Sequence, residues 1–216
     1  MEEIDVAKFI IGMLLLSYSS YQDLKYREAD NWIWIVIALA GIFFIFFDLR
    51  KWLPILISIS ISVTIAFLLY LFGMGGADSK ALMSLSFLNP LPPSFSIFHS
   101  PIFIFPITIL INSLLLILPL PIFFFIYNLY KKNAEFPYCF FGYKMNAREA
   151  EKKFVWSMER DGKKSIMPQK EEDLKKYGNK EIWVTPKIPF LLFIATGYAV
   201  SFIFGDVLFF LVSFLQ

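Results

Sequence analysis

The chain has 216 residues, of which 57% are hydrophobic and 26 are phenylalanine. A soluble domain of this size has roughly 45–50% apolar residues, so much of this surface must face something other than water. No charged residue occurs between Lys80 and Lys131, whereas a bilayer needs about 20 apolar residues for each helical crossing. These numbers exclude an ordinary soluble protein and predict a protein that crosses a membrane several times.

The counts of reactive residues exclude several kinds of site. The single cysteine, Cys139, excludes a disulfide framework and a multi-cysteine zinc site. The single histidine, His99, excludes the HExxH chemistry of metalloproteases. It lies in a proline-rich stretch without a nucleophile motif, which argues against a serine–histidine pair. We therefore expect no metal, no other cofactor and no nucleic-acid partner.

Six apolar segments are predicted to be transmembrane helices. The acidic N-terminus lacks the basic region of a secretory signal, so the first segment is interpreted as a retained helix. A proline-rich turn at 89–94 separates the fourth segment from the fifth. In chain order, the six are about Ile4–Gln22, about Trp32–Phe47, a helix within Trp52–Ala77, about Ser79–Leu88, about Phe103–Tyr130, and a helix from near Ile188 to about Asp206 or beyond.

Residues 131–187 differ sharply from the rest of the chain, with 14 of the 20 Lys and Arg and 9 of the 18 Asp and Glu. We expect a small cytoplasmic domain here, containing an amphipathic helix over Asn146–Arg160 and Trp183 near the membrane interface. The predicted fold is an all-α polytopic membrane protein. Residues 1–130 form a bundle of five helices, 131–187 the charged domain and 188–216 the last transmembrane helix.

The distribution of basic residues predicts the orientation in the membrane. An alternating path places 17 Lys and Arg on one side and only Lys8, Arg50 and Lys51 on the other. Cytoplasmic loops carry the excess of Lys and Arg. The N-terminus is therefore expected outside and the charged domain inside.

Two aspartates fall at the cytoplasmic face in this topology. Asp23 follows the first helix and Asp78 follows the third. Two carboxyl groups brought close together share one proton, so that one can deprotonate a water while the other protonates a carbonyl. Such chemistry needs no metal, cysteine or histidine. Either aspartate alone is more typical of an interfacial charge, but together they predict an aspartic peptidase.

The segment before Asp78 is rich in glycine, which lets a backbone approach an extended peptide. Lys80 is a candidate for holding the substrate backbone, although a lysine here is also typical of the membrane interface. The candidate loop or substrate-binding residues are Gly73, Gly75, Gly76, Ala77 and Lys80.

At these residues the sequence resembles the archaeal preflagellin peptidases, relatives of the type IV prepilin peptidases in the GxGD class of membrane aspartyl proteases. The resemblance rests on residues 22–28 followed by Asn31, on 75–80 in the place of GxGDxK, and on 181–186 before the last helix. It implies that Asp23 and Asp78 form the catalytic pair. It also implies cleavage of short class III signal peptides from archaellin or type IV pilin-like precursors at the cytoplasmic face of the membrane.

One position departs from the family's pattern. Ala77 stands where GxGD has glycine, and we expect this to stiffen the loop without removing activity. Two other kinds of function remain open from the residues alone. One is a small transporter or channel subunit that uses Asp23 and Asp78 as an ion site, and the other is a membrane scaffold that makes its contacts through the charged domain.

Overall fold

The structure is a computed structural model that describes residues 2–94, 96–98, 102–160, 162–169, 174–213 and 215. His99 lies outside the described residues. The chain forms two compact units, one of Met1–Ile117 with Pro189–Gln216 and the other of Leu118–Ile188.

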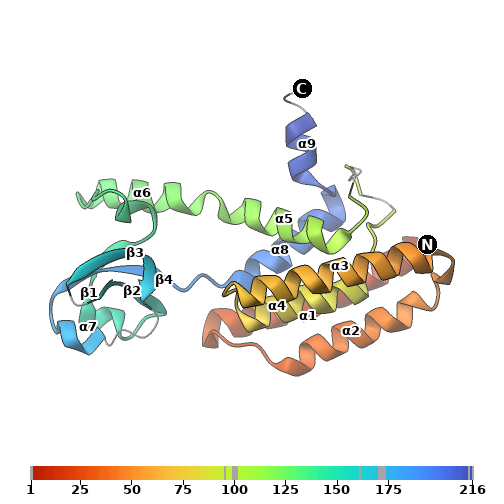
Figure 1. The fold of residues 1–216 in the computed structure, drawn as a ribbon, viewed down its shortest axis with the longest axis horizontal. Coiled ribbons are helices and arrows are strands. Elements are labelled where there is room, and N and C mark those ends of the chain that lie inside the picture. Colours follow the sequence, from red (N-terminus) through yellow and green to blue (C-terminus); the bar gives the residue numbers. More distant parts are fainter. Residues whose placement is uncertain are drawn as a thin grey trace. The chain divides into compact units, whose positions relative to one another are not determined.

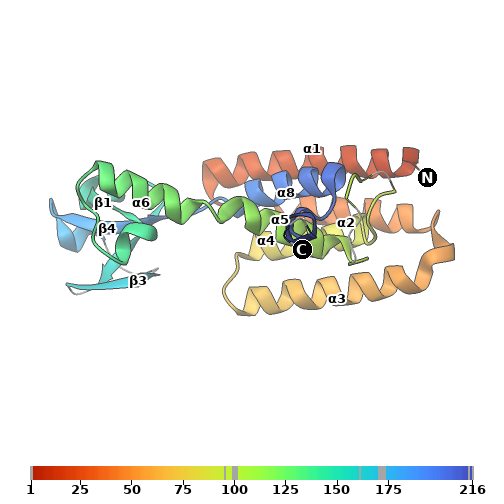
Figure 2. The same ribbon diagram turned by 90° about the horizontal axis from the view of Figure 1, so that it is seen from above.

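The first unit is a helix bundle, in which the longer helices run alongside one another (Figures 1 and 2). The short α4 lies at its centre and contacts α1, α2, α3, α5 and α8. Leu82, Leu85 and Leu88 of α4 are buried, and so is Ser84, whose hydroxyl donates to the backbone oxygen of Ala81. The helices are α1 (Glu2–Tyr26), α2 (Asn31–Ile45), α3 (Trp52–Leu71), α4 (Gly76–Leu88), α5 (Phe105–Ile117), α8 (Phe190–Phe204) and α9 (Val207–Ser213), with a 3-10 turn η1 (Leu49–Lys51).

Three helical runs are long and apolar enough to cross a membrane, namely Glu3–Tyr26, Trp52–Leu71 and Phe105–Tyr130. Two shorter apolar helices, α2 and α8, accompany them. The chain is therefore a membrane protein with a mostly helical fold, while the number of six crossings stays a prediction. The expected last helix is interrupted at Gly205, between α8 and α9.

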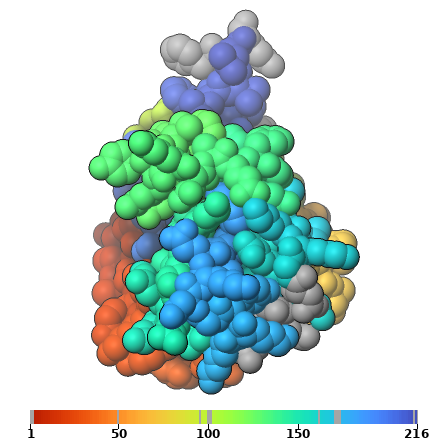
Figure 3. Space-filling view, turned by 90° about the vertical axis from the view of Figure 1, so that its left-hand side faces the viewer, coloured from red at the N-terminus to blue at the C-terminus, as the bar shows by residue number. Residues whose placement is uncertain are grey.

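The second unit begins with α6 (Leu120–Tyr130), which follows α5 after a break at Leu118 and Pro119. A proline cannot donate the backbone hydrogen bond that would continue a helix. Asn128 of α6 is buried, and its amide group donates to the backbone oxygens of Cys139 and Gly142. In the space-filling view, green α6 lies against the atoms of the small domain that follows it (Figure 3).

That small domain is a four-stranded antiparallel sheet with the order β1-β4-β2-β3. Ile182, Trp183 and Val184 of the inner strand β4 are all buried because both faces of the sheet are covered. The elements are β1 (Tyr143–Asn146), β2 (Val155–Arg160), β3 (Lys163–Gln169) and β4 (Glu181–Pro186), with η2 (Tyr138–Phe140), one turn of helix α7 (Ala147–Ala150) and η3 (Leu174–Tyr177).

This sheet corrects two expectations. The fold is not all-α, and the predicted helix over Asn146–Arg160 ends after one turn at Ala150. The reason is that residues 155–160 pair with the adjacent strand β3 and with β4, and β4 lies more than 20 residues further along the chain and leaves no mark on local periodicity. Trp183 is fully buried in the domain, and its position near the membrane interface stays a prediction.

Candidate active site

Asp23 lies in the last turn of α1 and is held against the beginning of α8. The backbone N–H of Leu191 is within hydrogen-bonding range of the Asp23 carboxylate. One turn earlier on α1, the hydroxyl of Ser20 donates to the backbone oxygen of Leu191 over 3.0 Å. The first N–H groups of a helix have no partner within it, so the start of α8 supplies a donor that orients this carboxylate.

Asp78 lies in the first turn of α4, outside the three long apolar runs. Its carboxyl group is close enough to Asp23 for the two negative charges to repel each other. Burial is the larger cause and this repulsion is the smaller one, and together they raise the pKa of Asp78 to about 7. The structure thus brings together two aspartates that are 55 positions apart in the sequence.

The glycine-rich segment makes a sharp turn between α3 and α4. Gly73 has a φ of +98°, a conformation that favours glycine. Gly75 precedes α4, and a Cβ atom at this position would lie 2.5 Å from Oδ2 of Asp78. A side chain at residue 75 would therefore displace the carboxyl group.

Ala77 does not have the effect on backbone freedom that we expected. It lies within the first turn of α4 together with Gly76, and its φ is not positive. Alanine is the best helix-forming residue. The departure from the GxGD pattern at this position therefore suits the helix and does not strain the turn.

Lys80 is exposed, and its ammonium group donates to the side-chain oxygen of Asn31 over 2.7 Å. This bond links α4 to the first residue of α2. Nearby, the side chain of Gln22 makes two hydrogen bonds to Asp30, which hold the α1–α2 loop closed beside Asp23. The observed contacts of Lys80 are therefore those of a residue that links two helices.

Two neighbours of Asp23 were not expected at this site. Arg27 follows α1 and lies near enough to interact electrostatically with the Asp23 carboxylate. Leu191 contributes its backbone only. No property of the leucine side chain could have indicated it, whereas the position of Arg27 four residues after Asp23 is visible in the sequence.

The two carboxyl groups have the properties that acid–base hydrolysis requires. A pKa of about 7 keeps a large fraction of Asp78 protonated near neutral pH, while Asp23 accepts a hydrogen bond at a helix N-terminus. One group can then donate a proton and the other can accept one. A helical membrane protein with such a pair has the groups that a membrane-embedded aspartic peptidase uses.

Comparison with known proteins agrees with this class. A sequence profile of the type IV leader peptidase family matches residues 10–122, and a profile described as "Archaeal Peptidase A24 C-terminus Type II" matches residues 134–207. The preflagellin peptidase of Methanococcus voltae is 34% identical over 92% of this chain and 95% of its own length. The preflagellin peptidase of Methanococcus maripaludis is 33% identical over 96% of this chain and 99% of its own length. That of Methanocaldococcus jannaschii is 30% identical over 92% of this chain and 94% of its own length.

The chain belongs to the type IV leader peptidase family, and it is a peptidase of a membrane. The resemblance seen in the sequence is therefore confirmed. The assignment of individual residues to catalysis stays a prediction.

Proposed function

We propose that this chain removes the short class III signal peptide from preflagellin precursors, with Asp23 and Asp78 as the catalytic pair. The main observation is that Asp78 is partly buried and has a raised pKa to which the charge of Asp23 contributes, in a chain similar over most of its length to preflagellin peptidases. Type IV pilin-like precursors are the second candidate substrate. The transporter alternative has no support from the comparisons.

The proposed reaction is the hydrolysis of one peptide bond. A water between the carboxyl groups loses a proton to ionised Asp23 and attacks the carbonyl carbon, while protonated Asp78 gives its proton to the carbonyl oxygen. The carbon–nitrogen bond then breaks, and the proton held by Asp23 passes to the leaving amine. Asp78 regains a proton as the carbonyl re-forms, so that the pair returns to its starting state.

The site is proposed to face the cytoplasm, with the N-terminus outside and residues 131–187 forming a cytoplasmic domain. The support is the excess of Lys and Arg on the side of the aspartates. The glycine-rich turn over Gly73–Gly76 is proposed to receive the extended segment of the precursor that contains the scissile bond. The bundle itself is proposed to be surrounded by membrane lipid.

A membrane assay tests the catalytic pair. Membranes that contain the wild type, Asp23→Asn or Asp78→Asn are mixed with a preflagellin precursor or with a pilin precursor, and leader removal is followed by gel shift. Glu28→Gln is the matched control because Glu28 is an exposed carboxylate in the loop after Asp23. Both aspartate variants should be present in membranes and inactive, while the control cleaves normally.

The other outcomes have distinct meanings. Cleavage by either asparagine variant would show that the pair is assigned wrongly, even though the chain is a peptidase. Cleavage of the pilin precursor alone would move the substrate to the second candidate. Wild-type membranes that cut neither precursor would contradict both proposed substrates.

A further inference from the structure

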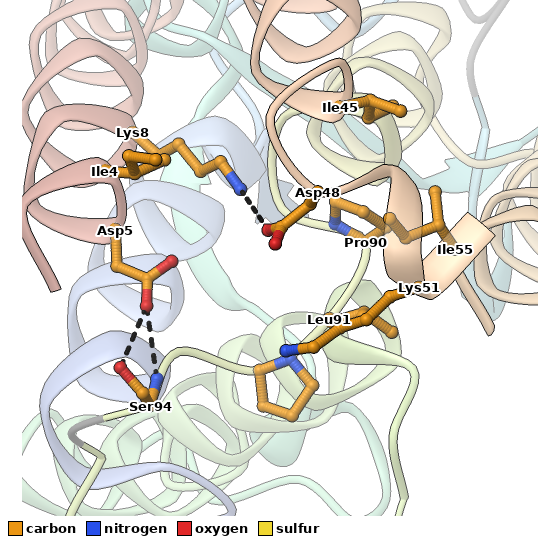
Figure 4. Close-up of a pocket in the computed structure, with 11 residues that line it drawn as sticks. Ile4, Asp5, Lys8, Ile45, Asp48, Lys51, Ile55, Pro90, Leu91 and Ser94 are labelled. Atoms are coloured by element: carbon orange, nitrogen blue, oxygen red, sulfur yellow. Dashed lines mark hydrogen bonds and ion pairs between the residues drawn. The ribbon is translucent and has the colours of Figure 1, made fainter. Parts of the chain in front are cut away.

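A polar pocket lies at the opposite end of the first unit from Asp23 and Asp78. Its volume is about 100 Å³, and it lies between the start of α1, the turn that joins α2 to α3 and the chain after α4 (Figure 4). A single water occupies about 10–15 Å³ of such space, so the pocket has room for a group of several atoms. Four charged residues line it, namely Asp5, Lys8, Asp48 and Lys51.

The side chain of Lys8 is buried, and its ammonium group is poorly paired where it borders the pocket. The side chain is only 8% exposed, and its nitrogen lies 4.0 Å from Oδ2 of Asp48, too far for a hydrogen bond. Among the described residues this ammonium makes no hydrogen bond, although it has three N–H donors. Asp5, by contrast, accepts from both the backbone N–H and the hydroxyl of Ser94. The pocket is therefore lined by an ammonium group that has no hydrogen-bond acceptor among the described residues.

The pocket also lies at the depth of lipid headgroups. Asp5 and Asp23 are both on α1 and 18 residues apart, which corresponds to about 27 Å at 1.5 Å per residue. The hydrocarbon core of a bilayer is about 30 Å thick. If Asp23 lies at one membrane surface, the pocket lies at the other. Apolar side chains of Ile4 and Ile55 line it together with the charges, as expected where headgroups meet acyl chains.

We propose that this pocket binds the headgroup of an aminophospholipid. The phosphate oxygens accept hydrogen bonds from Lys8, with Lys51 as the second cation, and the amine donates to Asp48 beside Asp5. The two carboxylates balance the two lysines, so a purely anionic group gains no net attraction here. A group that carries both a phosphate and an amine can pair with charges of both signs in this pocket. This binding is independent of the proposed peptide cleavage.

The test titrates the purified full-length protein, freed of bound lipid in detergent, in native mass spectrometry. The probes are phosphatidylethanolamine, phosphatidylglycerol with the same acyl chains, and inorganic phosphate. The wild type is compared with Lys8→Met and Lys51→Met. Lys25→Met is the matched control because Lys25 is an exposed lysine at the other end of the same helix. Thermal unfolding confirms that each variant is folded.

Loss of one charge-assisted hydrogen bond should weaken the binding of phosphatidylethanolamine about tenfold in Lys8→Met. Lys51→Met should weaken it to a smaller extent, and Lys25→Met should not change it. Asp48→Asn should remove the preference for phosphatidylethanolamine over phosphatidylglycerol.

Each remaining outcome decides a part of the proposal. Binding of inorganic phosphate that depends on Lys8, without binding of either lipid, supports a phosphate site and overturns the lipid source. Equal binding by the wild type and both lysine variants overturns the site altogether and leaves a cluster of charges that holds only water. If Lys8→Met does not fold, Lys51→Met and Asp48→Asn carry the same test.

Discussion

The hydroxyl group of Tyr198 in α8 lies 3.1 Å from the backbone oxygen of Lys8 in α1. It is also 2.9 Å from the side-chain oxygen of Asn89, which directly follows α4. Tyr198 and Asn89 are both buried. Helices α1 and α4 carry Asp23 and Asp78 at their other ends. One buried hydroxyl therefore links these two helices at the ends remote from the carboxyl groups.

Removal of this hydroxyl should destabilise the bundle. Tyr198→Phe removes the O–H donor that the backbone oxygen of Lys8 and the side-chain oxygen of Asn89 share, and the buried Asn89 oxygen loses its hydrogen bond, which costs about 1–3 kcal/mol. The expected result is a lower free energy of unfolding, measured by denaturant titration in detergent. Tyr18→Phe is the control because Tyr18 is exposed on the same α1. Equal stability of the two variants would contradict a role for the link.

The space at Gly75 should matter more for cleavage than for folding. In Gly75→Ala the new Cβ atom would lie 2.5 Å from Oδ2 of Asp78 and would displace the carboxyl group. Misplacement of a catalytic group by about 1 Å can lower a rate about a hundredfold, so we expect leader cleavage to fall at least tenfold. Gly76→Ala is the comparison, because it changes the same turn but its Cβ would meet Tyr70 at 3.7 Å and not the carboxyl group, so its loss of activity should be the smaller one. Similar rates for both variants would contradict the prediction.

The pH dependence of cleavage should follow the protonation of Asp78. Its pKa is raised to about 7 by burial and by Asp23. The pair is active only while Asp78 keeps its proton, so the rate should be lost above about pH 7, approaching a tenfold decrease for each further pH unit. Initial rates on a precursor between pH 6 and 9 check this. A rate that stays constant up to pH 9 would show that Asp78 is not the acid.

Stability should change with pH in a way that does not depend on activity. The pKa of Asp78 rises from 3.8 to about 7 on folding, so between these values the folded state binds more protons than the unfolded state. The contribution of Asp78 to stability therefore falls as pH rises from about 4 to about 7. Asp78→Asn should melt at a higher temperature than the wild type at pH 8, and the difference should shrink toward pH 4. A constant difference across this range would contradict the raised pKa.

Lys80 should be dispensable for catalysis. Its ammonium group bonds to Asn31 rather than to either aspartate among the described contacts. We therefore expect Lys80→Ala to retain most of its cleavage activity, with a modest loss of stability that Asn31→Ala shares. Precursor cleavage and thermal unfolding of both variants are the measurements. A folded Lys80→Ala variant without activity would assign Lys80 to substrate binding.

Much of this protein follows from local sequence alone. The excess of apolar residues requires a membrane environment, and charges are excluded from the apolar helices, so aspartates accumulate at helix ends. For this reason Asp23 and Asp78 could be selected as candidates without a structure. Gly75 and Gly76 beside Asp78 strengthened that choice because of their permissive backbone.

Interactions between distant parts of the chain could not be predicted in this way. The segment that ends in β2 looked helical because Ala147, Ala150, Phe154 and Met158 have helical spacing, but pairing with β4 decides the conformation of β2. In the same way, the buried position of Trp183 depends on neighbours that only the folded domain supplies.

The sequence by itself therefore determined the membrane class, the candidate carboxyl groups and the resemblance to a peptidase family, because each depends on composition or on short motifs. Only the tertiary structure decided that Asp23 is oriented by the backbone of Leu191 and that its charge acts on Asp78. It also decided that Lys8 is buried in a pocket. The physical reason is that burial, charge repulsion and hydrogen bonding act through space, between residues whose separation along the chain carries no record of their contact.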